Sequence, residues 1–430
     1  MKLKCAVFSA CLVAALAVLP PASLDAQQPT IKIGVLHSLS GTMAISETTL
    51  KDTVLMMIDE QNKKGGLLGR KLEAVVVDPA SDWPLFAEKA KQLLEKDKVA
   101  VVFGCWTSVS RKSVLPVFEK DNGLLFYPVQ YEGEESSKNV IYTGAAPNQQ
   151  AIPAVDYLMK DVGVKRWVLE GTDYVYPRTT NKILEAYLKA KGVAAADISI
   201  NYTPFGHADW QTRVAAIKRF GSAGKKTAVV STINGDANVP FYKELANQKV
   251  SAEQIPVVAF SVGEEELSGL DAKPLVGHLA AWNYFQSIKT PANDAFIKQW
   301  KTYIKKANRT TNDPMEAHYI GFNLWVKAVE KAKSTDVEKV LAALPGLETP
   351  NLTGGVAKML PNHHITKPVY IGEVRADGQF DVVWKTPGTV PGDAWSDYLP
   401  VSKDTEADWV TLKCGNYNTK SKVCSGQNYK

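Results

Sequence analysis

The sequence predicts an α/β protein of two lobes, each built around a doubly wound parallel sheet. First, a chain of 430 residues is too long for one ordinary hydrophobic core. Second, near-continuous apolar runs such as 99–103 and 124–127 are typical of strands that are buried on both faces. Third, such runs alternate with helical patterns, and the alternation starts again after a break at 139–155.

The first lobe is predicted from the order strand, helix, strand, helix, strand. A helix with one apolar face starts near Glu47 and ends at Gly65 and Gly66, where glycine favours a helix end. A second helix begins at Asp82 and Pro84, and a third should begin where Cys105 to Ser108 follow a strand. The predicted strands of this lobe are 31–36, 72–77, 99–103 and 124–127.

The second lobe repeats this alternation after a crossover at 139–155. Its first helix has Pro177 near its first turn, a position that suits proline. The segment 278–284 is predicted to return to the first lobe, whose cover the helices 293–306 and 313–333 then complete. The predicted strands are 166–169, 227–231 and 255–260, followed by a hairpin around Asp377 and Gly378.

The charge pattern argues against nucleic-acid binding. The formal net charge is +5, which is small for this length, and the lysines are scattered. A nucleic-acid site would need a basic stripe with interleaved aromatic residues, and the sequence has none.

The N-terminal segment has the layout of a secretory signal. Lys2 and Lys4 precede an apolar run at 6–19, and small residues follow up to Ala26, after which cleavage is expected. The run is too short and too rich in alanine for a comfortable transmembrane helix.

Three cysteines remain after that cleavage. Cys414 and Cys424 lie in a polar tail, and export favours a disulfide between them. Cys105 then has no partner, and we interpret it as a small buried residue at a strand end rather than as a reactive thiol.

Enzyme motifs are absent from the sequence, which lacks GxSxG, HExxH, GxxxxGK[ST] and a GxGxxG after a strand. His363 and His364 are adjacent, so their side chains diverge, and we interpret them as surface-loop residues rather than metal ligands. Asp173 is best explained as a turn or cap residue, whereas the role of Asp236 stays open. We expect no catalytic residue, no metal and no cofactor.

Aromatic residues recur in the loops that follow predicted strands of both lobes. A flat, uncharged ligand can be held between such rings, while hydroxyl and amide groups pair with its edge. Thr107, Ser108 and Gln130 can supply those groups. An amino-acid ligand would need a carboxylate clamp, which Arg111 and Arg178 do not offer from their helix starts, although backbone N–H groups could. The aromatic residues are Trp106, Tyr127, Tyr131, Tyr174 and Tyr176.

Longer segments, spread in order over the chain up to about Trp409, point to one family. They are LSGTMA, FGCWTSVSRKSVLPVFE, YPVQYEG, YTGAAPNQQ, GTDYVYPRTTN, STINGDANVPFYKEL, EAHYIGFNLW and NHHITKPVYIGEVRADGQFDVVW. Together they resemble the urea-binding proteins of ABC transporters, which are type I periplasmic binding proteins. Related families are the branched-chain amino-acid binders and a short-chain amide receptor. The resemblance implies two Rossmann-like lobes joined by three crossovers, with the ligand in the cleft between them.

The resemblance also implies particular ligand contacts. Trp106 stands where the amide receptor has a ligand-contacting tyrosine, and Ser108 matches a serine that bonds the amide. Tyr127, Tyr174 and Tyr176 match further aromatic contacts. Thr107 and Tyr131 lie in the same loops, and we expect them to contact the ligand as well, because Thr107 offers a hydroxyl group and Tyr131 offers an aromatic ring.

Three further positions bear on the choice of ligand. Val129 and Gln130 depart from the threonine and proline of the amide receptor. Urea has a second amino group where acetamide has a methyl group, and Gln130 can offer that group an acceptor. Asp236 lies in a second-lobe loop that touches ligand in this superfamily, so it is expected to accept from urea N–H groups.

We therefore expect an exported protein that captures urea by closure of its lobes and delivers it to two permease subunits served by an ATPase pair. It should act as a monomer, without covalent chemistry. The alternatives are a binder of short-chain amides or branched-chain amino acids, an amide hydrolase, and a sensory ectodomain. The expected boundaries are 1–26 for the leader, 30–148 with 281–360 for the first lobe, 149–280 with 361–398 for the second, and 399–430 for the tail.

Overall fold

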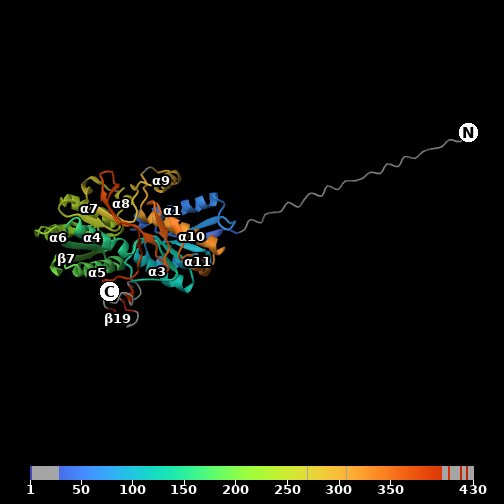
Figure 1. Ribbon diagram of the computed structural model, residues 1–430, viewed down its shortest axis with the longest axis horizontal. Coiled ribbons are helices and arrows are strands. Elements are labelled where there is room, and N and C mark those ends of the chain that lie inside the picture. Colours follow the sequence, from blue (N-terminus) through green and yellow to red (C-terminus); the bar gives the residue numbers. More distant parts are fainter. Residues whose placement is uncertain are drawn as a thin grey trace.

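The computed structural model describes residues 1, 29–268, 270–306 and 308–399, with the short strands β17 (Thr405–Glu406), β18 (Tyr417–Asn418) and β19 (Val423–Cys424). The predicted leader, apart from Met1, and Cys414 of the predicted disulfide lie outside the described residues. The described core forms two lobes that lie side by side (Figure 1). We call the lobe that contains the N-terminal strand lobe 1 and the other lobe 2.

Lobe 1 is built on a five-stranded sheet in the order β2-β1-β3-β4-β5, in which all neighbours are parallel. Its strands are rich in Val, Ile, Leu and Phe, as expected for strands that are covered on both faces. They are β1 (Ile31–Leu36), β2 (Leu72–Val77), β3 (Val101–Gly104), β4 (Leu125–Tyr127) and β5 (Val140–Tyr142).

Helices cover both faces of this sheet because successive strand residues point to opposite sides. Val101 and Phe103 pack in the core that α10 and α11 cover, whereas Val102 packs in the core that α2 and α3 cover. The helices of lobe 1 are α1 (Ala44–Lys63), α2 (Trp83–Lys91) with the π-helical turn η1 (Gln92–Lys96), α3 (Ser108–Lys120), α9 (Pro291–Ile304), α10 (Asp313–Ala332) and α11 (Val337–Ala343).

Lobe 2 is built on a seven-stranded sheet in the order β15-β14-β10-β9-β8-β6-β7. The sheet is parallel except at β14, which is antiparallel to both β10 and β15. The predicted hairpin around Asp377 and Gly378 is confirmed, and Gly378 has the positive φ of +75° that glycine tolerates. The strands are β6 (Arg166–Thr172), β7 (Ile198–Thr203), β8 (Thr227–Thr232), β9 (Val257–Ala259), β10 (Leu279–Trp282), β14 (Tyr370–Val374) and β15 (Phe380–Lys385).

The helices of lobe 2 also flank both faces of its sheet, with α4 and α5 on one side and α6 and α7 on the other. They are α4 (Ala151–Lys160), α5 (Val175–Ala190), α6 (Gln211–Gly221), α7 (Asn238–Asn247) and α8 (Glu264–Leu267), with the 3-10 turns η2 (Pro147–Gln149), η3 (Ala195–Asp197), η4 (Gly235–Ala237) and η5 (Lys273–Leu275). Two small sheets complete the described fold, formed by β11 (Glu348–Pro350) with β12 (Val356–Lys358) and by β13 (Thr366–Lys367) with β16 (Val390–Pro391).

The chain passes between the lobes after β5, after β10 and before β14. The prediction that 278–284 returns to lobe 1 was wrong in part, because β10 is a strand of the lobe 2 sheet and the return follows Trp282. The flanks of the predicted 361–398 piece also stay close to lobe 1, since the Tyr142 N–H donates to the His363 carbonyl at 2.9 Å and the Glu134 N–H donates to the Ala394 carbonyl at 2.5 Å. Only the β14–β15 hairpin of that piece lies in the lobe 2 sheet.

Candidate ligand-binding site

Loops that follow strands of both lobes meet between the two sheets. After β4, Gln130 donates from Nε2 to Oγ of Ser261, which follows β9, at 2.7 Å. After β3, Trp106 donates from Nε1 to Oδ1 of Asn234, which follows β8, at 3.2 Å. Each bond joins one residue of lobe 1 to one of lobe 2, so the lobes are closed on one another.

Two tyrosines of lobe 2 lie at the same junction. The ring centroids of Tyr174 and Tyr176, at the start of α5, are 6.2 Å apart, and Phe205 lies 4.8 Å from Tyr174. Both tyrosines pack against Val109 of α3, which belongs to lobe 1. We call the residues that meet here the interlobe cluster, which consists of Trp106, Gln130, Tyr174, Tyr176, Asn234 and Ser261, all of them buried.

The interlobe cluster contains two buried polar atoms without a hydrogen-bond partner. They are Oε1 of Gln130 and the hydroxyl oxygen of Tyr176. The Tyr176 hydroxyl faces Gln130 and Ser261, and burial raises the pKa of Tyr176 above its ordinary value, so the hydroxyl keeps its proton. Buried polar groups that lack a partner are uncommon and cost about 1–3 kcal/mol each. The cluster therefore offers an acceptor and a hydroxyl group to a small polar molecule.

Charged side chains lie next to this cluster on the lobe 1 side, and they neutralise one another. Ser108 donates from Oγ to Glu132, and the Arg111 guanidinium contacts Glu132 at 2.9 Å and Glu135 at 2.8 Å. Lys112 contacts Glu135 at 2.7 Å. Burial alone would raise the pKa of Glu135, but Arg111 and Lys112 outweigh it and hold that pKa well below its ordinary value. Two cations thus balance two carboxylates, and no buried charge in this group is left for a ligand.

Tyr127 and Tyr131 face this charged group, and the structure does not bring Tyr131 to the interlobe cluster. Tyr131 lies with its ring centroid 4.8 Å from that of Tyr142 and hydrogen-bonds His364 at 2.5 Å. The guanidinium carbon of Arg111 lies 4.8 Å from the Tyr127 ring and 4.7 Å from the Tyr131 ring. These contacts turn the Tyr131 ring into the interior of lobe 1.

The interpretation of His364 as a surface-loop residue was wrong. Its side chain is buried, and its ring stacks on Tyr142 with centroids 4.7 Å apart. Burial lowers the pKa of His364 to about 4. His363 is partly buried, with Nδ1 3.2 Å from the Ser137 carbonyl oxygen.

Thr107 supports helix α3 through its side chain, and Val129 lies in the Gln130 loop, whose backbone packs against Gly144. Thr107 caps α3, since its Oγ1 accepts from the Ser110 N–H at 3.1 Å. The backbone of Val129 and Gln130 passes so close to Gly144 that a Cβ there would lie 2.0 Å from the Val129 carbonyl carbon. Gly144 thereby fixes the loop that carries Gln130.

Asp236 is exposed, and the structure does not bring its carboxylate into the interlobe cluster. Its backbone N–H instead donates to the Thr42 carbonyl of lobe 1 at 3.2 Å. The preceding Gly235 has φ +70°, and a Cβ there would lie 2.8 Å from the same carbonyl oxygen. The backbone of turn η4 in lobe 2 thus contacts lobe 1 directly.

Replacing Asp236 by asparagine is therefore expected to change ligand affinity by less than about twofold, because an exposed group contributes little to a buried contact. Isothermal titration calorimetry on the variant and the parent protein measures this. A loss of about tenfold or more would restore Asp236 to the site.

Sequence reasoning missed Asn234, Ser261 and Glu132. Asn234 lies three residues after the predicted strand 227–231, and Ser261 directly follows the predicted strand 255–260, so the strand-end rule that selected Gln130 would also have found them. Glu132 follows the aromatic cluster of the lobe 1 loop, but its buried pairing with Arg111 cannot be seen in the sequence.

Two further observations concern the described part of the chain. Among residues 29–268, 270–306 and 308–399, no group of three or more His, Cys, Asp or Glu is arranged to hold a metal ion. None of the helices in the described part of the chain is long and apolar enough to cross a membrane.

Comparison with known proteins places this chain in one family. Residues 31–401 match the family of the periplasmic binding protein domain, and the chain belongs to that family. It is 27% identical over 357 residues to the Leu/Ile/Val-binding protein BraC3 of Rhizobium johnstonii, which covers 81% of this chain and 91% of that protein.

Two other similarities carry less information. The solute-binding protein of an ABC transporter from R. palustris, solved with 4-hydroxybenzoate, has a TM-score of 0.73 at 22% identity, covering 86% of this chain and 100% of the other, which shows a shared fold. A limonene hydroxylase from Geobacillus stearothermophilus is 32% identical over 124 residues, covering 28% of this chain and 22% of the hydroxylase. The chain therefore spans only a small part of that protein.

Proposed function

We propose that this chain is the exported substrate-binding protein of an ABC importer and that its ligand is urea, held between the closed lobes. The observation that carries the proposal is the pair of unpaired polar atoms in the interlobe cluster, Oε1 of Gln130 and the hydroxyl of Tyr176. Urea has a carbonyl acceptor with an amino group on either side. The Gln130 oxygen can accept from an amino group while the Tyr176 hydroxyl donates to the carbonyl.

The balanced charges beside the cluster support a neutral ligand. An amino acid or an aromatic acid carries a carboxylate, which would have to displace Glu132 or Glu135 from Arg111 to reach a cation. Displacing Glu132 or Glu135 from Arg111 would leave a buried carboxylate unpaired, at a cost of several kcal/mol. Without that displacement, only uncharged side chains and backbone N–H groups are left to contact the carboxylate of the ligand.

The aromatic rings of the cluster supply the faces for a flat molecule. Trp106 comes from lobe 1, whereas Tyr174 and Tyr176 come from lobe 2, so the rings approach one another only when the lobes close. Closure would then couple ligand capture to a joint surface that a membrane permease can recognise.

The buried thiol of Cys105, the residue before Trp106, is consistent with binding without covalent chemistry. Cys105 is fully buried, and burial raises its pKa well above the ordinary value, so the thiolate that a nucleophile needs is suppressed. We therefore favour a binding protein over an amide hydrolase.

Calorimetric titration of the mature protein with urea, acetamide, leucine and 4-hydroxybenzoate tests the proposal. We expect saturable heat with urea, weaker binding of acetamide because a methyl group replaces one of the two amino groups of urea, and no heat with the two carboxylates. Tight binding of leucine or 4-hydroxybenzoate without urea binding would contradict it. Release of ammonia from urea would show a hydrolase instead.

A further inference from the structure

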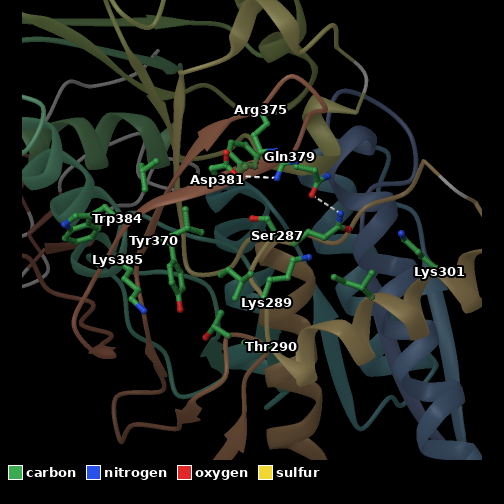
Figure 2. A pocket seen from close by; sticks show the side chains of 17 residues that line it. Ser287, Lys289, Thr290, Lys301, Tyr370, Arg375, Gln379, Asp381, Trp384 and Lys385 are labelled. Atoms are coloured by element: carbon green, nitrogen blue, oxygen red, sulfur yellow. Dashed lines mark hydrogen bonds and ion pairs between the residues drawn. The ribbon is translucent and has the colours of Figure 1, made fainter.

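A pocket lies beside the connection from lobe 2 to lobe 1 (Figure 2). Its volume is about 1060 Å³, and none of its lining residues belongs to the interlobe cluster. Its walls are the β14–β15 hairpin of lobe 2, the connecting segment 286–290, and α9 of lobe 1. An occupant of this pocket would therefore contact both lobes.

One wall of the pocket is the outermost strand of the lobe 2 sheet. β15 pairs with β14 on one side, and no described strand pairs with its other side. Val382 and Val383 on this strand are 38% and 43% exposed, and a register shift leaves Val383 outside the pairing with β14. An edge strand with exposed apolar side chains is a template to which an extended segment can add as a further strand.

The pocket also carries an excess of positive charge. Arg375 is satisfied, since it contacts Asp377 at 2.8 Å and Asp381 at 3.3 Å. Lys289, Lys301 and Lys385 also line the pocket, and within the described part of the chain none of their ammonium groups has an ion-pair partner. The charge that complements this surface is negative.

We propose that this pocket is the docking site for an acidic, extended polypeptide segment of a partner protein. The segment adds to the outer edge of β15, lays apolar side chains on Val382 and Val383, and places carboxylates near the three lysines. Figure 2 shows these lysines at separate points along the pocket, which suits a chain of spaced carboxylates better than a single compact anion. A phosphate ion would also leave the open backbone of β15 and the two valines without a contact.

Fluorescence anisotropy with a labelled synthetic peptide of alternating glutamate and valine tests this docking site on the mature protein without urea. We expect binding that weakens as salt rises, because exposed charge pairs are screened. The combined variant Lys289→Ala, Lys301→Ala and Lys385→Ala should weaken it by about tenfold. The matched control Lys165→Ala, Lys226→Ala and Lys243→Ala removes the same charge from exposed lysines outside the pocket and should leave binding unchanged.

Two further arms identify the kind of occupant. Changing Val382 and Val383 together to serine should weaken peptide binding without altering charge. Inorganic phosphate should weaken peptide binding no more than sodium chloride does at the same ionic strength. The proposal is overturned if the parent protein does not bind the peptide, if the control lysine variant loses as much affinity as the pocket variant, if the valine variant binds as the parent does, or if phosphate displaces the peptide more than sodium chloride does at equal ionic strength. Because urea is absent, these results do not depend on the identity of the ligand in the interlobe cluster.

Discussion

Replacing Arg111 by methionine is expected to lower the free energy of unfolding by about 3–5 kcal/mol, because it leaves two buried carboxylates without their main partner. The Arg111 side chain is fully buried and contacts both Glu132 and Glu135. Methionine keeps much of the volume, so the change isolates the charge. Guanidinium chloride denaturation measures the effect, and urea is avoided as denaturant because it is the proposed ligand.

Arg375 provides the matched control for this experiment. Its ion pair with Asp377 is exposed, with 44% and 53% of the two side chains accessible. Arg375→Met should lower the free energy of unfolding by less than about 1 kcal/mol, since exposed ion pairs contribute little to stability. If both variants lose the same free energy of unfolding, the buried ion pairs of Arg111 do not stabilise the fold more than an exposed pair does.

The same group predicts how stability depends on pH. The folded-state pKa of Glu135 is held below its ordinary value. Its contribution to the free energy of unfolding is therefore complete above the ordinary glutamate pKa of about 4.3. That contribution is lost as pH falls from this value through the lowered pKa. The parent protein should therefore lose more stability over this acidic interval than Arg111→Met does.

Replacing Gly144 by alanine is expected to weaken urea binding by more than about tenfold, because the added Cβ must move the backbone that presents Gln130. The Cβ would lie 2.0 Å from both the carbonyl carbon and the carbonyl oxygen of Val129 and 2.7 Å from the Gln130 nitrogen. These neighbours are backbone atoms, so no side chain can turn away. Calorimetry with urea measures the loss, and circular dichroism checks that the variant is folded.

Gly388 serves as the control, since nothing lies within 4 Å of a Cβ at that position. Gly388→Ala should bind urea as the parent does. If Gly144→Ala is folded and binds urea with unchanged affinity, the position of the Gln130 loop does not determine binding.

The fold could be predicted where burial is uniform along an element. The strands predicted at 99–103 and 227–231 have apolar centres, and they correspond to the buried strands β3 (Val101–Gly104) and β8 (Thr227–Thr232). By contrast, β7 has the mixed sequence ISINYT because it is a half-buried edge strand, and it was not predicted. The short strand β10 was predicted to be part of a connection between the lobes. It pairs with β9 and β14, and its own four residues do not reveal that pairing, which depends on how the sheet is assembled.

The candidate site could be predicted at the level of loops but not of side-chain direction. Tyr131 and Tyr176 both follow a strand, yet only Tyr176 lies at the interlobe junction, since His364, far along the chain, holds Tyr131 inside lobe 1. In the NGDAN loop, Asn234 is buried against Trp106 while Asp236 is exposed. Such differences depend on how a turn is oriented between two lobes, which one sequence does not show.

A crystal structure of the mature protein with urea is the most direct measurement of how the ligand is held. We predict urea between the lobes, within hydrogen-bond distance of Gln130 Oε1 and the Tyr176 hydroxyl, the two buried atoms of the interlobe cluster that lack partners. Urea bound elsewhere, or a closed protein in which those two atoms remain unpaired with no urea between the lobes, would contradict it.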